Sequence, residues 1–448
     1  MPRKSGEYSS ELSEAVRLPK SAEQEVIINE DEKELIFDTV QRGREILKKH
    51  FIPGLGVVPS ENPEENFYNQ LWARDAAHAI GNTPDDFAAT WTSLAKLFEH
   101  QKESGMLPLR VEKEYMMIKL VPGLRNLAKP LFDLVEGKIR GRKERPVYEG
   151  QDLSGAEDTV PVTLLAVGEF FVNGGEEGKK FFNSHYEQIF KAVDFFSKKT
   201  DDADGLAETG ELSPDWVDSI NRAGKLGGIN VYWFRALRLM EFMCRQTGKT
   251  EEAGLYKEMA AKVNKSIHEK LYDKDSGCIK SAIDDDRIDT VASVYAGLYL
   301  LTPSEAEKME ETFKEKVISP SGFLMNFNQP YPGEQKQSAH HFIGHTGYHD
   351  KYAWPWVTCQ NIQVKIKIAK DHPDKSIREK NKAEVVQDLL LAAKNFKDNA
   401  GAYEILNPET GKPASSRTYK PPKDFMANWA AYLSAYEQAV KLGWLKAE

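Results

Sequence analysis

Cysteine is scarce in this sequence, which has only Cys244, Cys278 and Cys359 among its 448 residues. They lie far apart and in no metal-ligand spacing, which argues against a disulfide framework, so we expect reduced core residues. Apolar runs of the roughly 18–20 residues that a membrane-spanning helix needs are also missing. The N-terminus lacks the apolar core of a secretion signal, which predicts a cytoplasmic protein without a membrane partner.

Excess basic charge is missing as well, because the net charge is −9. Nucleic-acid binding relies on a basic face that neutralises phosphates, so we expect no such partner. No sequence repeat of fixed period is visible, and segments with the alternating pattern of strands are few. The length exceeds an ordinary domain of ~100–200 residues, but large toroids and barrels reach it. We predict an N-terminal extension over residues 1–25 and one domain over residues 26–448.

What the sequence does have is helical periodicity. Apolar residues recur at helical spacing along most of the chain, which predicts a mainly α-helical fold. The predicted helices cover residues 30–50, 84–104, 113–135, 158–173, 178–200, 228–248, 250–272, 288–302, 304–317, 352–370, 375–399 and 424–443.

These helices are of two kinds. Residues 158–173, 228–248, 288–302 and 424–443 are apolar nearly all round, which predicts inner helices buried on more than one side. Residues 250–272, 304–317 and 375–399 are amphipathic and rich in charge, which predicts outer helices with one buried face. Alternating inner and outer helices indicate stacked antiparallel hairpins, closed into a ring or open as a solenoid.

The longer connections precede the inner helices and are rich in aromatic and acidic residues. They cover residues 67–82, 148–158, 202–228, 340–356 and 401–425. If the inner helices are parallel, these loops share one end of the bundle. A rigid scaffold that presents loops on one rim is typical of a binding or catalytic site.

The rim loops carry the chemistry of a sugar site. Cleavage of a glycosidic bond needs a proton for the leaving oxygen and a nucleophile at the anomeric carbon, which two carboxyl groups can supply. The candidate acids are Asp75, Glu157, Asp158, Asp215, Asp218, Asp350 and Glu404. Aromatic faces suit the C–H surfaces of sugars, and the candidates are Tyr68, Trp72, Trp216, Trp233, Tyr348, Trp354, Trp356 and Trp429.

Several of these segments resemble a known family. WARDAAHAIG (residues 72–81) is similar to the Trp-Gly-Arg-Asp segment of the amylo-α-1,6-glucosidase domain of glycogen-debranching enzymes and of related glycosidases of families 63 and 15. DGLAETGELSPDWVDSINRAGKLGGINVYWFRAL (residues 204–237) resembles the block that bears their general acid. WPW (residues 354–356) and GAYEILNPETGKP (residues 401–413) resemble their Trp-Pro-Trp and general-base segments.

The resemblance implies an all-α (α/α)6 toroid of alternating inner and outer helices and an inverting mechanism without metal or cofactor. It places the general acid on Asp218, whose pKa should then be raised, and the general base on Glu404. Arg74 and Asp75 would hold hydroxyls of the terminal sugar. The further expected substrate-binding residues are Tyr68, Trp72, Glu157, Asp158, Asp215, Trp216, Lys225, Asn230, Trp233, His345, Tyr348, Trp354, Trp356 and Trp429.

The chain also departs from debranching enzymes, because Gly228 replaces a Glu and no transferase barrel precedes the domain. We therefore expect hydrolysis of a terminal α-glucoside or α-mannoside, at an oligosaccharide end or in a small glycoside such as glucosylglycerate or mannosylglycerate. Arg110, Arg222 and Arg417 are candidates for binding an anionic aglycone. The rival hypotheses are a sugar isomerase or epimerase that uses a histidine, and a sugar-binding protein without catalysis.

Three local alternatives accompany this interpretation. Asp215 lies close enough to Asp218 in sequence to be the acid instead. Residues 200–211 resemble a calcium loop, but Thr200 stands at the first ligand position, which favours an ordinary turn. The histidines at 341, 345 and 349 have the spacing of a zinc site on a helix, but the glycines at 344 and 347 favour a loop.

Overall fold

The computed structural model describes residues 28–60, 70–83, 86–112, 144–148, 157–210, 215–337, 347–416 and 419–445. The predicted N-terminal extension and the predicted helix over residues 113–135 lie outside these residues. Tyr68, His345 and Arg417 lie outside them as well. Within the described part the chain is mostly helical, as its periodicity predicts.

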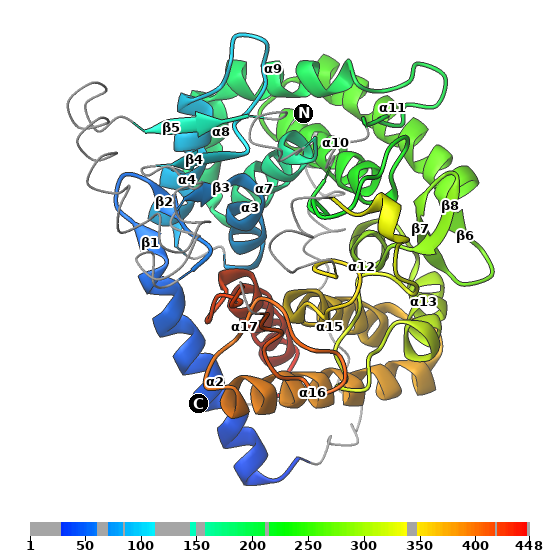
Figure 1. Cartoon of the computed structure of the whole chain (residues 1–448). Coiled ribbons are helices and arrows are strands. Elements are labelled where there is room, and N and C mark those ends of the chain that lie inside the picture. The colour runs from blue at the N-terminus through cyan, green and yellow to red at the C-terminus, as the bar shows by residue number, and fades with distance from the viewer. Residues whose placement is uncertain are drawn as a thin grey trace, which may run out of the picture.

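Six inner helices form a closed ring, in which each contacts the next and the last contacts the first. In order they are α3 (Ala73–Asn82), α7 (Thr159–Asn173), α10 (Gly227–Gln246), α12 (Thr290–Tyr299), α15 (Pro355–Asp371) and α17 (Met426–Lys441). The outer helices are α2 (Glu30–Lys49), α4 (Phe87–Glu99), α8 (Gly175–Ser184), α9 (Tyr186–Ser197), α11 (Thr250–Ser266), α13 (Pro303–Lys316) and α16 (Lys375–Asp398). Figure 1 shows them around the inner ring. The fold is the predicted (α/α)6 toroid.

Burial explains the two kinds of helix. In α7 every residue from Thr159 to Gly168 is buried, because this helix packs between two inner neighbours and an outer layer. In α11 the buried residues include Ala253, Tyr256, Ala260 and Val263, which recur every three or four positions. One buried stripe is what an outer helix needs, since its opposite face meets water.

Short strands brace the connections. β3 (Leu71–Trp72), β4 (Arg110–Glu112) and β5 (Arg145–Val147) form an antiparallel sheet in which Arg110 pairs with both Trp72 and Val147. The other strands and short helical turns are β1 (Phe51–Ile52), β2 (Gly56–Val57), β6 (Tyr272–Asp273), β7 (Cys278–Ala282), β8 (Asp285–Ile288), η2 (Ile267–Leu271) and η3 (Gly333–Gln335). The sheet of β3, β4 and β5 fixes the segment that leads into α3, and so it fixes part of the rim.

The structure corrects the prediction for residues 67–82. Where a rim loop was expected, Leu71–Trp72 form a strand and Ala73–Asn82 form the first inner helix. Ala73, Ala76 and Ile80 pack in the core at helical spacing. The charged residues between them hide this pattern, because they face a cavity rather than the core.

Two further boundaries differ from the prediction. The helix expected over residues 178–200 is two helices, α8 and α9, which are separated at His185. The helix expected over residues 84–104 covers only Phe87–Glu99, and its start is set by Asp86, whose carboxylate accepts a hydrogen bond from the Ala89 amide.

All three cysteines are buried and unbonded, as predicted. No helix among the described residues combines the length and the apolar character that a bilayer span requires. The cytoplasmic location stays a prediction.

Candidate active site

One end of the toroid contains a cavity that is open to solvent. Its walls come from the segments that lead into the inner helices α3, α10, α15 and α17, together with the first turns of three of them. The lining residues are Trp72, Arg74, Asp75, His78, Trp216, Asp218, Tyr348, His349, Trp354, Trp356, Glu404, Phe425 and Ala427. Long-range folding thus gathers nine of the predicted site residues around one space.

Asp218 reaches this cavity from the segment before α10, and 28% of its side chain is exposed. His349 lies beside it, with Nδ1 3.9 Å from Asp218 Oδ1 and 2.8 Å from Ser219 Oγ. The His349 ring stacks on Trp354 at 5.2 Å, and the edge of Trp216 packs against it. The carboxyl group is therefore set in a rigid aromatic wall.

Asp215 has a different role from Asp218. It forms a buried ion pair with Arg222, which also contacts Asp289 Oδ2 at 3.2 Å. Asp215 Oδ1 accepts a hydrogen bond of 3.0 Å from the Val217 amide. Asp215 therefore anchors the segment in the core, and of the two acids only Asp218 lines the cavity.

Glu404 enters the same cavity from the C-terminal loop, and it is 1% exposed. Its backbone amide donates to the carbonyl oxygen of Pro422 at 3.1 Å. Two residues further on, Leu406 pairs with Ala353, next to the aromatic wall. The hydroxyl of Tyr419 donates a hydrogen bond to Glu404 Oε2. The loop thus holds this carboxylate by both its backbone and its side chain.

Arg74 and Asp75 occupy the first turn of α3. The Nε of Arg74 lies 3.6 Å from Oδ1 of Asp158, which stands immediately before α7 and is fully buried. Burial raises the pKa of both Asp75 and Asp158 to about 7, although the positive charge of Arg74 opposes the rise. Protonation of this group of acids therefore changes close to neutral pH.

The raised pKa of Asp158 predicts a pH-dependent stability. A carboxyl whose pKa is higher in the folded state contributes most at low pH, and its contribution is lost as the pH rises toward 7. We expect the Tm of Asp158→Asn, relative to that of the original chain, to increase between pH 5 and pH 8. Thermal unfolding across this range measures the difference, and a difference independent of pH contradicts the prediction.

His78 lines the floor of the cavity. Its Nδ1 lies 2.7 Å from the hydroxyl of Tyr295, and its ring packs on Trp356 at 4.6 Å. Burial and the charge of Arg74 lower the pKa of His78 to about 3, so the ring is neutral at physiological pH. His78 also borders a second cavity, which lies between the inner helices.

A family comparison shows which class of protein this chain belongs to. The model of the mannosylglycerate hydrolase MGH1-like glycoside hydrolase domain matches residues 68–420. The chain belongs to this glycoside hydrolase family. The match spans most of the chain, and it confirms the resemblance to family 63 that the sequence motifs predicted. A search among curated protein sequences gives no match.

Solved structures share the fold of this glycoside hydrolase. Family 63 mannosylglycerate hydrolase from Thermus thermophilus, in complex with glucose, is 15% identical with a TM-score of 0.59, and the match covers 89% of this chain and 99% of that one. A complex of the same hydrolase with Tris and D-glycerate has 14% identity, a TM-score of 0.55, and coverage of 91% and 99%. A rhamnosidase from Klebsiella oxytoca with rhamnose bound has 10% identity, a TM-score of 0.61, and coverage of 95% and 66%.

Two tryptophans of the hydrolase are corrected to core residues. Trp233 is buried beside Phe196, with ring centroids 4.8 Å apart. Trp429 is fully buried 4.9 Å from the ring of Phe396, and it leaves no room for a side chain at position 43, where Gly43 stands. The sequence could not place them, because an inner helix is apolar all round and only its neighbours decide which side faces the axis.

Three polar residues predicted to bind substrate contact other parts of the protein. Lys225 donates to the carboxylates of Asp201 and Asp204 at 2.7 Å each. Asn230 is buried and exchanges hydrogen bonds with the backbone of Ala207. Glu157 accepts a hydrogen bond of 3.2 Å from the Gly210 amide. These contacts stabilise the segment that precedes Asp218. We therefore assign the three residues a structural role in place of the predicted contact with substrate.

The two tryptophan environments give a testable contrast. Trp429→Phe leaves a void in the core, which should cost about 1–3 kcal/mol of stability. Because Trp429 packs in the core and does not line the cavity, KM should stay within about two-fold. The matched substitution Trp356→Phe changes a cavity wall and should raise KM instead. A rise in KM for Trp429→Phe, measured at a temperature where it is folded, contradicts this assignment.

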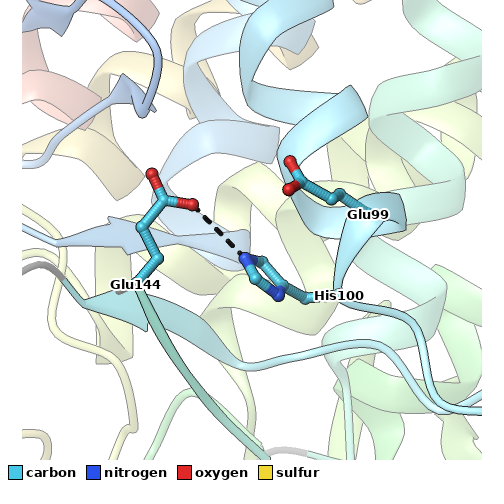
Figure 2. Close-up of side chains that lie close together, drawn as sticks. All are labelled: Glu99, His100 and Glu144. Atoms are coloured by element: carbon cyan, nitrogen blue, oxygen red, sulfur yellow. Dashed lines mark hydrogen bonds and ion pairs between the residues drawn. The ribbon is translucent and has the colours of Figure 1, made fainter. Parts of the chain in front are cut away.

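One group of side chains in the described residues has metal-ligand geometry. Figure 2 shows Glu99, His100 and Glu144, with His100 Nε2 3.4 Å from Glu144 Oε2. The ammonium group of Lys96 lies 2.7 Å from Glu99 Oε2 and 2.8 Å from Glu144 Oε2. Lysine therefore supplies the positive charge that a metal ion would bring, and we assign no metal to this group.

Lysines also neutralise the described part of the loop that resembles a calcium site. Asp204 accepts hydrogen bonds from Lys225 at 2.7 Å and from Lys270 at 2.6 Å. Burial alone would raise the pKa of Asp204, but these donors outweigh burial and lower the pKa to about 2. Glu211, which would complete the loop, lies outside the described residues. The geometry favours the turn over the calcium loop.

Proposed function

We propose that this glycoside hydrolase is an inverting α-glycosidase with Asp218 as general acid and Glu404 as general base. Its substrate would be a terminal α-glucoside or α-mannoside, at an oligosaccharide end or in a small glycoside. The main support is that these two carboxyls, from loops far apart in the sequence, line one cavity with aromatic walls. Hydrolysis of a glycosidic bond needs two carboxyl groups that face the same site, one as acid and one as base.

In the first half of the proposed reaction Asp218 protonates the glycosidic oxygen. The bond from this oxygen to the anomeric carbon breaks, its electron pair stays on the leaving group, and the ring becomes oxocarbenium-like. Asp218 must start protonated and ends as a carboxylate. Arg74, on the same cavity wall, is positioned to stabilise that negative charge.

In the second half Glu404 removes a proton from a water molecule on the opposite face of the ring. The water oxygen bonds to the anomeric carbon, so the configuration there inverts. Inverting enzymes hold their two carboxyls about 6.5–9.5 Å apart, which leaves room for that water. Proton exchange with solvent then restores both groups.

Specificity for the sugar would come from groups at the floor. Arg74 is a fixed fork of donors, and Asp75 offers an acceptor or, when protonated, a donor. Trp72, Trp354 and Trp356 present aromatic surfaces to the C–H faces of the ring. A pocket that encloses the terminal sugar in this way would favour cleavage at a chain end.

The proposed leaving group is small and anionic. The structural neighbour with bound D-glycerate motivates a small glycoside such as mannosylglycerate or glucosylglycerate. Two cations that the sequence offered for an anionic aglycone are engaged elsewhere. Arg110 Nε contacts Glu112 Oε1 at 2.6 Å, and Arg222 is held by Asp215 and Asp289.

A panel of substrates followed by NMR tests the proposed function. It should include mannosylglycerate, glucosylglycerate, and disaccharides with α-linked glucose or mannose. We expect release of the β-anomer first, before mutarotation, from at least one of them. Release of the α-anomer excludes inversion, conversion of free sugar supports the isomerase hypothesis, and binding without turnover supports a sugar-binding protein.

A further inference from the structure

A tyrosine that the motifs did not single out contacts the candidate base directly. Tyr419 is buried, and its hydroxyl donates a hydrogen bond to Glu404 Oε2. Its own backbone is fixed by Ser416, whose Oγ accepts from the Tyr419 amide at 3.1 Å and whose amide donates to the Tyr419 carbonyl at 2.9 Å. The hydroxyl is therefore held in place before substrate arrives.

The loop brings the two residues together although fourteen others separate them in the sequence. Leu406 pairs with Pro413, and the Ala414 amide donates to the carbonyl of Ile405 at 3.1 Å, so the chain folds back on itself. The returning segment then carries Tyr419 to the side chain of Glu404. One loop supplies both the carboxylate and its hydrogen-bond donor.

We propose that Tyr419 is the positioning residue of the general base. This inference rests on the proposed function, because it gives Glu404 the task of taking a proton from water. A hydrogen bond to Oε2 fixes the rotation of the carboxylate and directs Oε1 to the water. Donation to the ionised form also stabilises the carboxylate, which keeps the base deprotonated at lower pH.

A second tyrosine extends this arrangement toward the acid. The hydroxyl of Tyr348 lies 3.5 Å from that of Tyr419, and the two rings meet edge to face at 5.8 Å. The carbonyl of Tyr348 accepts a hydrogen bond of 3.1 Å from Trp354 Nε1. Tyr348 precedes His349, the neighbour of Asp218, so the two tyrosines connect the walls that carry the two carboxyls.

Other charged or titratable groups contribute to the electrostatics around Glu404. Around the cavity these are Arg74, Asp75, His78, Asp218, Tyr348 and His349, and behind the loop they are Arg42 and Asp424. A single substitution at Tyr419 leaves all of them in place. A change in the titration of Glu404 that follows this substitution therefore reports the tyrosine hydroxyl.

The test uses the full chain and reads Glu404 without relying on turnover. In protein labelled with ¹³C at glutamate carboxyls, the Glu404 signal is assigned by its loss in Glu404→Gln. We expect Tyr419→Phe to raise the pKa of this signal by about one pH unit. The matched control is Tyr432→Phe, because the Tyr432 hydroxyl is buried, has no hydrogen-bond partner among the described residues and lies in a different part of the core. An unchanged Glu404 titration in Tyr419→Phe overturns the proposal.

Kinetics on a hydrolysed substrate give the second readout. Tyr419→Phe should lower kcat by about ten-fold or more, leave KM within about two-fold, and move the acid limb of the pH profile upward. If the variant does not fold, 3-fluorotyrosine can be placed at position 419 instead. Its hydroxyl is a more acidic donor, so the acid limb of the pH profile and the titration of Glu404 should both move to lower pH. If Tyr419→Phe shifts the Glu404 titration but the original chain cleaves no glycoside, the coupling between Tyr419 and Glu404 is supported and the proposed function is rejected.

Discussion

Glu404→Gln is expected to abolish turnover while substrate binding persists. The amide keeps the shape of the side chain but cannot take a proton from water, so kcat should fall by about 10²–10⁴-fold. Because the amide can still contact hydroxyls, the Kd for substrate measured by calorimetry should change by less than about five-fold. The measurement needs the substrate that the NMR panel identifies.

Glu157→Gln is the matched control for this variant. Glu157 also precedes an inner helix, but it contacts the 199–210 segment and does not line the cavity. Its substitution should leave kcat within about two-fold. Substantial hydrolysis by Glu404→Gln, with the fold verified, rejects Glu404 as the base and with it the main support for inversion.

Asp218→Asn is expected to show a loss of activity that depends on the leaving group. Without a proton donor, cleavage of an alkyl glycoside or disaccharide should slow by about 10²–10⁴-fold. A 2,4-dinitrophenyl glycoside of the same sugar leaves without protonation, so its kcat should fall far less. The ratio of the two rates, measured for the variant and the original chain, isolates the role of the acid.

Asp215→Asn distinguishes the two acids of this segment. It removes the partner of Arg222 in a buried ion pair, so it should lower Tm and slow both substrates to a similar degree. If instead the leaving-group dependence follows Asp215 rather than Asp218, the assignment of the acid is wrong. The comparison therefore tests a choice that sequence spacing left open.

Much of the fold could be predicted because its determinants are local. An inner helix such as α7 must be apolar all round, and an outer helix such as α11 must have one apolar stripe, so periodicity alone separates them. The order of motif blocks around Asp218 and Glu404 then identified the family and one rim of the toroid. The helix α3 escaped detection because Arg74, Asp75 and His78 interrupt its apolar pattern.

The composition of the site depended on contacts between distant segments. Periodicity cannot show which side of a buried inner helix faces the axis of the toroid. The prediction was therefore the same for Trp356 and Trp429, but Trp356 lines the cavity and Trp429 packs in the core. His78 and Tyr419 are recognised as site residues only from their hydrogen-bond partners in the structure, Tyr295 and Glu404.

The sequence by itself determined an alternation of inner and outer helices, with acids and aromatics in the loops before the inner ones, because burial gives each kind of helix its own apolar period. Only the tertiary structure decided that Asp218 faces the cavity while Asp215 pairs with Arg222 in the core. That distinction depends on which charge lies opposite each carboxyl, and the opposing charge comes from elsewhere along the folded chain.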